Sequence, residues 1–346
     1  MNVTYLELKK KNKRMNIFKL TILLVAFTFI NRVTAQETIP IYFDYLSDNV
    51  YLLHPAAAGI GNCAKLRLSH GQQWAGVDNA PGLQTLSYHS RMSGESQVGL
   101  GGILYKDSNG NHSQLGAQGT FAYHIDMGGA DFNQLSFAIS GMYSEIKLDQ
   151  SNFILPGEEP DEVISGLVES ENYFNADFGL AYHYKTGFSY FTIKNLLLTA
   201  RDLENSTYEA LNLRRYLFSA GYFFENQKPN RLSFEPSFMV QYIEYTNEIV
   251  GDINLKAYKK LDKGNTLWAA VSYRRSFDGN KIQELSQITP IIGVNFNKFM
   301  VSYTYTHGLG DIVFDNSGFH QISLGIDLFC KEARAAACPN VNSNFR

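Results

Sequence analysis

The chain has 346 residues and a formal net charge of -3 at pH 7, which excludes the strongly basic class of nucleic-acid-binding proteins. Charged residues make up 18% of it, below the roughly 25% of a typical soluble domain, whereas Phe (24), Tyr (21) and Gly (28) are abundant. This composition favours β-structure with an aromatic-rich surface. The mean hydropathy of -0.20 does not argue against a membrane protein, because a β-barrel alternates lipid-facing apolar residues with lumen-facing polar ones.

The amino terminus has the features of a signal peptide over residues 1–35. Basic residues between positions 9 and 19 precede an apolar run over 20–30, and Val33-Thr34-Ala35 provides a cleavage site after Ala35. About eleven apolar residues cannot cross the roughly 30 Å hydrocarbon core as a helix, so we predict an exported chain, with Met1 or Met15 as its start. No later stretch approaches the roughly 20 apolar residues of a membrane helix. A membrane span would therefore be built from strands.

Residues 36–62 form a segment without a clean period. They include Pro40 and several aromatic residues, and they end close to the sequence Pro-Ala-Ala-Ala-Gly at 55–59. Because alternation is missing, this segment is not predicted as a strand. We assign it to the periplasm, with folding into the barrel mouth as the alternative.

Persistent alternation begins near residue 64 and predicts about fourteen strands. Phe121 and Tyr123, for example, alternate with Thr120 and Ala122, which is the period of two that places alternate side chains on opposite faces. An amphipathic helix would repeat every three to four residues, and these runs do not. The predicted strands are 64–72, 84–91, 98–106, 113–124, 134–147, 173–184, 188–194, 213–224, 231–242, 249–258, 265–275, 287–296, 298–305 and 319–329.

Single-chain bacterial outer-membrane barrels have an even number of strands. We therefore predict an all-β fold, a transmembrane antiparallel β-barrel over residues 63–329, followed by a periplasmic tail at 330–346. With the amino terminus in the periplasm, links after odd strands should be the long ones. The links after the fifth, seventh, eleventh and thirteenth strands are long, whereas Lys185-Thr186-Gly187 and Asn297-Lys298 are short.

Two features that resemble ligand sites have simpler interpretations. Gly99-Leu100-Gly101-Gly102 lies inside a predicted strand with no helix after it, so it is not a phosphate loop. Its glycines would let the strand bend or let the lumen be plugged closely. The acidic run at 156–162 is typical of a solvated loop tip and lacks the ligand spacing of an EF-hand. We predict no cofactor and no metal site.

A search for a hydrolase finds no supported constellation. Ser87 with His89, and His183 with Ser189, lack a Gly-x-Ser-x-Gly elbow and a third residue at a diagnostic spacing. Such polar side chains are expected to face inward and to fill the lumen. We therefore predict that the protein is not an enzyme and has no catalytic residues.

The three cysteines are Cys63, Cys330 and Cys338. An exported chain meets an oxidising compartment, and the short spacing between Cys330 and Cys338 favours a disulfide that closes a small loop after the last strand. Cys63 would then be free or would pair elsewhere. Metal binding is the competing interpretation, but no Cys-x-x-Cys motif or nearby His pair supports it.

Several short motifs occur at spacings found together in a known family. They are Pro55-Ala56-Ala57-Ala58-Gly59, Gln73-Trp74-Ala75-Gly76, Pro81 and Gly318-Phe319-His320-Gln321-Ile322-Ser323-Leu324. In this combination the chain resembles the PorP/SprF family of outer-membrane proteins from the type IX secretion and gliding systems of Bacteroidetes, over nearly the whole mature chain. His54 stands where the family usually has Asn and Gln321 where it often has Glu. These departures leave the fold prediction intact and bear on partner specificity.

The resemblance implies a non-enzymatic barrel that supports secretion or surface anchoring of adhesins with carboxy-terminal sorting domains. It also implies contact with periplasmic or lipoprotein components of the secretion and gliding machinery. The expected partners are these proteins and the lipid bilayer, without nucleic acid. The candidate partner contacts are the signature residues Pro55, Ala56, Ala58, Gly59, Gln73, Trp74, Gly76, Pro81 and His320.

Alternatives stay open for two of these residues and for the function. Trp74 is also what an aromatic girdle at the membrane interface would place there, and His320 could simply satisfy a hydrogen bond of the barrel. The alternative function is a transport channel for hydrophobic small molecules, similar to a fatty-acid channel. A plugged lumen would favour the secretion role, and a ligand-filled apolar pocket would favour transport.

Overall fold

The structure is a computed structural model that describes residues 46–74, 79–93, 96–128, 132–151, 168–197, 214–226, 231–261, 265–277, 286–309 and 318–330. All of them belong to one compact unit, Gln36–Arg346. The predicted signal peptide, the acidic run at 156–162 and the tail beyond residue 330 lie outside the described residues. Within the described ranges, none of the helices has the length and apolar character needed to cross a membrane.

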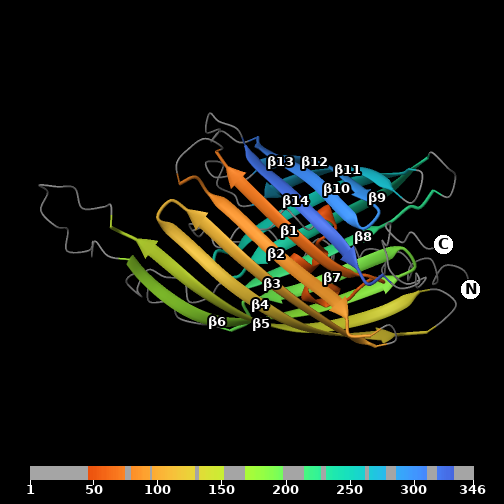
Figure 1. Cartoon of the computed structure of the whole chain (residues 1–346), viewed down its shortest axis with the longest axis horizontal. Helices are drawn as coiled ribbons and strands as arrows, with labels where there is room; N and C mark the ends of the chain where they lie inside the picture. Colours follow the sequence, from red (N-terminus) through yellow and green to blue (C-terminus); the bar gives the residue numbers. More distant parts are fainter. Residues whose placement is uncertain are drawn as a thin grey trace, which may run out of the picture. The chain divides into compact units, whose positions relative to one another are not determined.

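Fourteen antiparallel strands close into a barrel (Figure 1). Each strand pairs with its neighbours in sequence, and β1 pairs with β14 to close the sheet. The strands are β1 Ala64–Gln73, β2 Gly82–Arg91, β3 Val98–Asn109, β4 His112–Asp126, β5 Asn133–Asp149, β6 Val168–Tyr184, β7 Gly187–Lys194, β8 Arg215–Tyr222, β9 Leu232–Ile243, β10 Glu248–Lys260, β11 Thr266–Ser276, β12 Ser286–Phe296, β13 Phe299–Gly308 and β14 Phe319–Leu328.

This architecture confirms the predicted fold class and strand number. The largest difference in bounds is at β6, which begins at Val168 rather than at residue 173, because its pairing with β5 continues as far as Asp149. Alternation also places the residues as expected. On β4, Phe121 and Tyr123 are exposed on the outside while Thr120 and His124 are buried on the inside.

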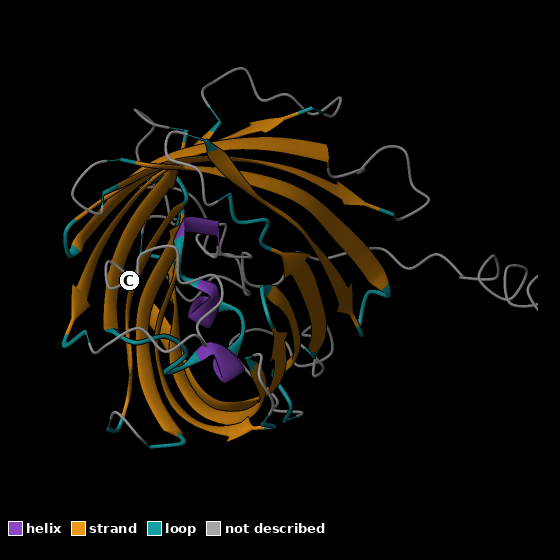
Figure 2. Cartoon of the chain, turned by 90° about the vertical axis from the view of Figure 1, so that its right-hand side faces the viewer, coloured by secondary structure: helices purple, strands orange, loops and turns teal. Residues whose placement is uncertain are grey.

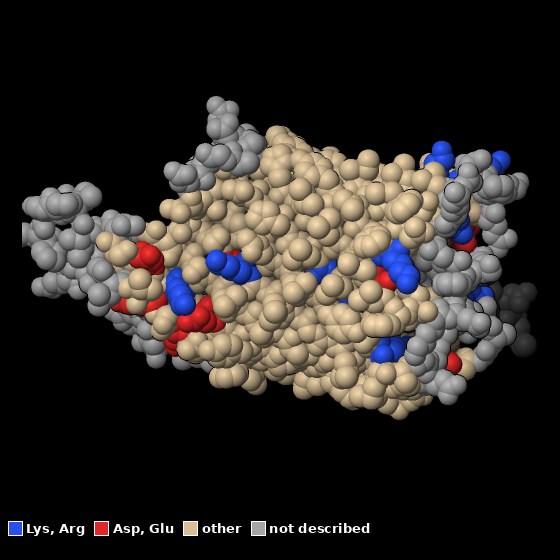
Figure 3. Space-filling view, in the orientation of Figure 1, with Lys and Arg blue, Asp and Glu red and all other residues tan. Residues whose placement is uncertain are grey.

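The outer wall is apolar, which is the surface that barrel strands present to lipid. Exposed Leu, Ile, Val, Phe and Tyr side chains occur on all fourteen strands or beside them. The middle of the described wall in Figure 3 is largely free of Lys, Arg, Asp and Glu, and most of the charged side chains in view lie toward its two ends. The strands therefore form an apolar band between two charged rims.

The links between strands divide between the two ends of the barrel. We call the end at which β1 begins and β14 ends the terminus end, and the other the loop end. The terminus end has the links 92–97, 127–132, 185–186, 223–231, 261–265 and 297–298, and the loop end has the long links 150–167, 195–214, 277–285 and 309–318. The predicted long links after the fifth, seventh, eleventh and thirteenth strands are confirmed, and the link 223–231 at the terminus end is an exception, since it is as long as 277–285.

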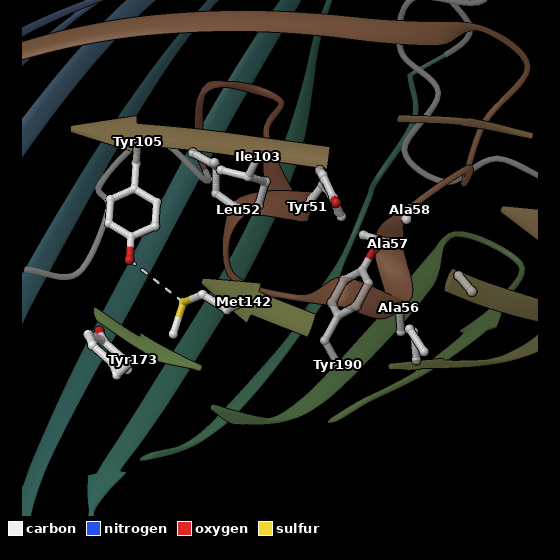
Figure 4. Packing of buried hydrophobic residues seen from close by; sticks show 13 residues of the cluster. Tyr51, Leu52, Ala56, Ala57, Ala58, Ile103, Tyr105, Met142, Tyr173 and Tyr190 are labelled. Carbon is white, nitrogen blue, oxygen red and sulfur yellow. Dashed lines mark hydrogen bonds between the residues drawn. The ribbon is translucent and has the colours of Figure 1, made fainter. Parts of the chain in front are cut away.

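Residues 46–60, which we call the luminal plug, lie inside the barrel (Figure 2). The plug contains two short 3-10 helices, η2 Val50–Leu52 and η3 Pro55–Ala57. Its apolar side chains enter two buried clusters, one against β3 to β7 (Figure 4) and one against wall residues between β8 and β13. For this part of the 36–62 segment the alternative of folding into the barrel is therefore favoured over a place in the periplasm, because its Leu, Tyr and Ala side chains are buried against the inner wall.

Candidate functional site: the luminal plug and the seam rim

The Pro-Ala-Ala-Ala-Gly motif forms the tightest part of the plug. Pro55 is at the start of η3, where its fixed φ is already suited to a helical turn. Ala56 and Ala58 are fully buried. Gly59 has a φ of +77, and a Cβ at this position would lie 2.8 Å from the Cα of Gly99. The motif therefore brings a sharply turning backbone directly against the wall.

Glycines of the wall make room for this backbone. A Cβ on Gly99 would collide with the carbonyl oxygen of Ala58, and one on Gly179 would lie 2.9 Å from the backbone nitrogen of Ala56. A Cβ on Gly101 would meet the ring of the plug's tyrosine. The interpretation of Gly99 and Gly101 as positions that let the lumen be plugged closely is thus confirmed.

His54 joins the plug to two neighbouring strands. Its Nδ1 lies 2.8 Å from Oγ1 of Thr192 on β7, and its Nε2 lies 2.8 Å from Oγ of Ser219 on β8. Burial, together with the nearby charge of Lys194, lowers the pKa of His54 to about 3. The ring is therefore neutral. The family usually has Asn at this position, and an Asn side-chain amide can also form hydrogen bonds with two hydroxyls. His54 can therefore take the place of Asn here.

Other side chains of the wall form hydrogen bonds with backbone groups of the plug. The Gly59 amide donates to Nδ1 of His89 at 3.0 Å, and Nε of Arg91 donates to the Gly59 carbonyl at 3.0 Å. Nε2 of His124 lies 2.9 Å from the Ala58 carbonyl, to which it donates. Because buried backbone groups are costly when unpaired, these residues hold the plug in one position.

Two lysines inside the barrel also bond to the plug backbone. Nζ of Lys256 on β10 donates to the carbonyl of Leu46 at 2.9 Å and lies 4.2 Å from the centroid of the Trp268 ring. Nζ of Lys194 on β7 donates to the carbonyl of Leu52 at 3.3 Å. The plug is thus bonded to strands on different sides of the lumen.

Asp48 holds the plug to the strands that close the barrel. Its carboxylate accepts from Nζ of Lys65 at 2.8 Å and from Nη2 of Arg67 at 2.9 Å, and Arg67 also donates to Asp327 at 2.7 Å. Burial opposes ionisation, but the positive charges of Lys65 and Arg67 outweigh it and keep the pKa of Asp48 well below its ordinary value. The charged network therefore links the plug, β1 and β14.

A disulfide lies beside this network, and it corrects the predicted pairing. Cys63 bonds to Cys330, with their Cα atoms 4.0 Å apart, so the predicted Cys330–Cys338 bond is wrong. The reason is barrel closure: Ala64 is paired with Leu328, so the residues just outside both strands are neighbours. Cys338 lies outside the described residues.

A second group of signature residues lies at the loop end of the β1–β14 junction. We call Gln73, Trp74, Pro81 and His320 the seam rim. The backbone N–H of Gln73 donates to the backbone carbonyl of Pro81 at 2.9 Å. Trp74 is half-buried and has a φ of 51. Nδ1 of His320 lies 2.6 Å from Oη of Tyr303. His320 thus makes a hydrogen bond within the barrel, as the alternative to a partner contact predicted. The register of β1 on β14 brings these distant motifs together.

The structure thus divides the signature between two places. Pro55, Ala56, Ala58 and Gly59 are in the luminal plug, the seam rim is at the opposite end of β1, and Gly76 lies outside the described residues. β1 leads from the residues that follow the plug to Gln73 of the seam rim at its other end. Sequence reasoning missed the side chains that hold the plug. The only available signal was that they occupy inward-facing polar positions.

The residue pairs considered for hydrolysis have other roles. Oγ of Ser87 donates to Oδ1 of Asn49 at 3.2 Å, so this serine bonds to the plug as His89 does. His183 is buried and bonds to the hydroxyl of Tyr190 on β7. Ser189 precedes Tyr190 on that strand and therefore faces away from His183. In the part of the chain that the structure describes, no group of three or more His, Cys, Asp or Glu could hold a metal ion.

Comparisons with known proteins agree with the motifs. Residues 34–326 match the family described as type IX secretion system membrane protein PorP/SprF. No curated protein matches the sequence. This is a family of secretion-system membrane proteins and not a known enzyme family.

Similar solved structures share little sequence with this chain. A deletion mutant of TodX, a monoaromatic hydrocarbon channel, has a TM-score of 0.48 and 10% identity, covering 81% of this chain and 93% of that one. CdiB from Acinetobacter baumannii has a TM-score of 0.41 and 10% identity, covering 76% of this chain and 59% of that one. BamA from Haemophilus ducreyi has a TM-score of 0.39 and 8% identity, covering 77% and 70%.

The family match and the fold support each other. The matched residues include the whole luminal plug and strands β1 to β13, and a closed barrel with an apolar outer wall is the form of an outer-membrane protein. The chain belongs to the PorP/SprF family of type IX secretion system membrane proteins.

Proposed function

We propose that this barrel supports secretion or surface anchoring of adhesins with carboxy-terminal sorting domains and contacts periplasmic or lipoprotein components of the secretion and gliding machinery. In this arrangement the loop end faces the cell surface and the terminus end faces the periplasm, as is general for bacterial barrels with short periplasmic turns. The protein acts by binding, and no covalent bond is made or broken.

The observation that supports this proposal is the filled lumen. The plug is bonded to β1, β2, β4, β7, β8 and β10, and its alanines Ala56 and Ala58 have 0% exposure. A diffusion channel needs a continuous path, whereas here residues 46–60 of the chain itself lie inside the barrel and pack against strands on different sides of the lumen. A barrel closed in this way offers surfaces for partners rather than a pore.

We assign the seam rim to the secreted partner. It combines Trp74 with the hydrogen-bonded pair Tyr303 and His320, and large aromatic side chains carry much of the binding energy at protein interfaces. Its geometry is fixed by the pairing of β1 with β14 and by the bond from Gln73 to Pro81. The machinery would instead contact the terminus end, so the two interactions are separable.

The test is affinity isolation of the tagged barrel from intact outer membranes, with mass spectrometry of the proteins that accompany it. The wild type should recover a large protein with a carboxy-terminal sorting domain together with secretion subunits. Trp74→Ala should reduce recovery of the large protein about 30-fold, which corresponds to a binding hot spot of about 2 kcal/mol, and should leave the secretion subunits in place. Tyr245→Ala is the matched control, because Tyr245 is a 46% exposed aromatic at the same end.

Two outcomes would contradict the proposal. If neither class of protein is recovered and the purified barrel retains fatty acid or another apolar molecule, the protein is a transport channel. If Trp74→Ala and Tyr245→Ala reduce recovery equally, the seam rim is not the contact for the secreted partner.

A further inference from the structure

Exposed cations follow part of the terminus end. We call Lys185, Arg231, Lys259, Lys260 and Lys298 the basic arc, since they lie in or beside the successive links from β6 to β13. In the described residues of these links the only carboxylate is that of Glu225, which pairs with Lys260 at 2.9 Å. The arc therefore carries a net positive charge.

Cations of the arc lie next to exposed apolar side chains on the outer wall. Tyr184 (46% exposed) precedes Lys185, and Leu232 (46%) follows Arg231. Phe296 and Phe299, each 56% exposed, stand on either side of the turn that contains Lys298, and Leu261 (42%) follows Lys260. Aromatic rings at the edge of an apolar band mark the membrane interface. The cations thus lie at the depth of lipid headgroups.

Backbone hydrogen bonds fix the turns that present these cations. The Lys185 amide donates to the carbonyl of Phe132 at 2.8 Å, and the Lys298 carbonyl accepts from the Asp327 amide at 2.7 Å. Nζ of Lys185 also lies 5.5 Å from the centroid of the Tyr184 ring. The basic side chains therefore extend from fixed positions, and only their flexible stems need to adjust to a headgroup.

The arc is confined to one side of the terminus end. In the described parts of the β2–β3 and β4–β5 links there is no Lys or Arg. Arg91, at the end of β2, donates to the plug at Gly59, to the Ser96 carbonyl and to Gln134. Lys65 and Arg67 are likewise engaged by Asp48. The cations beside β1 to β5 therefore bond to the plug and to neighbouring strands, whereas the five of the arc are exposed at the terminus end.

We propose that the basic arc binds the phosphate headgroups of anionic phospholipids and so collects them on the β6–β13 side of the barrel. A basic residue near a membrane surface favours an anionic lipid by roughly fivefold. The proposal goes beyond the role in secretion and does not depend on it, because it concerns only the barrel and its bilayer.

The test uses the purified full-length barrel and two probe lipids. Phosphatidylglycerol and phosphatidylcholine with the same acyl chains are offered in equal amounts, the protein is re-isolated, and both bound lipids are counted by mass spectrometry. The wild type should enrich phosphatidylglycerol about fivefold or more. The variant Arg231→Gln/Lys259→Gln/Lys298→Gln, which leaves Lys185 and Lys260 in place, should lower the ratio well below that of the wild type.

The matched control removes three exposed cations from the outer wall toward the loop end, as Lys106→Gln/Lys147→Gln/Arg275→Gln. It should enrich phosphatidylglycerol as the wild type does. Equal amounts of both lipids on the wild type, or the same loss of enrichment in both triple variants, would overturn the proposal. Folding of each variant is checked by heat-modifiable migration in electrophoresis, so a misfolded barrel is recognised before lipids are counted.

Discussion

Replacing Gly179 by Val should loosen the luminal plug while leaving the barrel folded. A Cβ on Gly179 would lie 2.9 Å from the backbone nitrogen of Ala56 and 3.4 Å from Cδ of Pro55. The nearest atom belongs to the backbone, so no side-chain rotation relieves the overlap. The wall gives less easily than the plug, because β6 is paired on both sides over residues 178–184.

The size of the effect follows from the cost of overpacking. Extra methyl groups in a well-packed interior cost about 1–3 kcal/mol, and each 1.4 kcal/mol changes an equilibrium tenfold. The population with the plug displaced should therefore rise roughly 5- to 150-fold over the wild type. The two hydrogen bonds of nearby His54 are the first that a displaced η3 would lose.

Ionic conductance of the barrel in planar bilayers, together with protease cleavage within residues 46–60, measures this displacement. Gly141→Val is the control, since Gly141 is on neighbouring β5, faces outward and has no atom within 4 Å of an added Cβ. Both variants should show the heat-modifiable migration of a folded barrel. If Gly179→Val conducts and is cleaved no more than Gly141→Val, the close contact between the plug and β6 is refuted.

Three further outcomes are expected. Arg67→Met should lower the free energy of unfolding in urea by about 2–3 kcal/mol. This is less than the 3–5 kcal/mol for breaking a fully buried ion pair, because the carboxylate partners of Arg67 are 24% and 14% exposed. The control Arg275→Met, at an exposed position, should change the free energy of unfolding by under about 0.5 kcal/mol. The pKa of His54 is lowered from 6.5 to about 3, so its neutral form stabilises the docked plug above pH 6.5 and this contribution falls as the pH drops below it; conductance should rise between pH 7 and 5 in the wild type and rise less in His54→Gln, in which His89 and His124 still bond to the plug backbone. Peptide mapping without reductant should find the disulfide lost in Cys63→Ser and retained in Cys338→Ser, and loss in both variants would contradict the pairing seen here.

The barrel itself was predictable because its strands repeat one simple pattern. A residue such as Phe121 must face lipid and the next must face the lumen, so each strand carries its own period-two signal. The even strand number and the sorted link lengths gave independent support. Only the exact ends of some strands could not be predicted without the partner strand. The start of β6 is an example, because Val168 belongs to the strand only through its pairing with Asp149 on β5.

The plug was not predictable in the same way. Residues 46–60 have no period, and their contacts join positions far apart in sequence, as His54 and Ser219 do across 165 residues. Glycines within a strand gave a partial signal, because Gly99 and Gly101 have no advantage in a strand unless something approaches closely. Nothing in the sequence says which inward-facing polar residue meets which atom of the plug.

The disulfide shows a signal that was present and misread. Short spacing favoured Cys330 with Cys338, but the predicted barrel already placed Cys63 before the first strand and Cys330 after the last. Since the first and last strands of a closed barrel are neighbours, topology outweighed spacing. The same reasoning explains why Gln72 meets His320, although the two are at opposite ends of the sequence.

The Cys63–Cys330 bond, which spans 267 residues of sequence, also determines how the barrel carries mechanical load. A pull on a free last strand would peel β14 from β1 one hydrogen bond at a time, starting at the terminus end. With the bond in place, a force on the carboxy-terminal tail passes through Cys330 and Cys63 into the segment that leads to the plug, and β14 cannot peel from β1 at the terminus end. A machine that pulls on either end of this chain would therefore pull on the plug before it opened the wall.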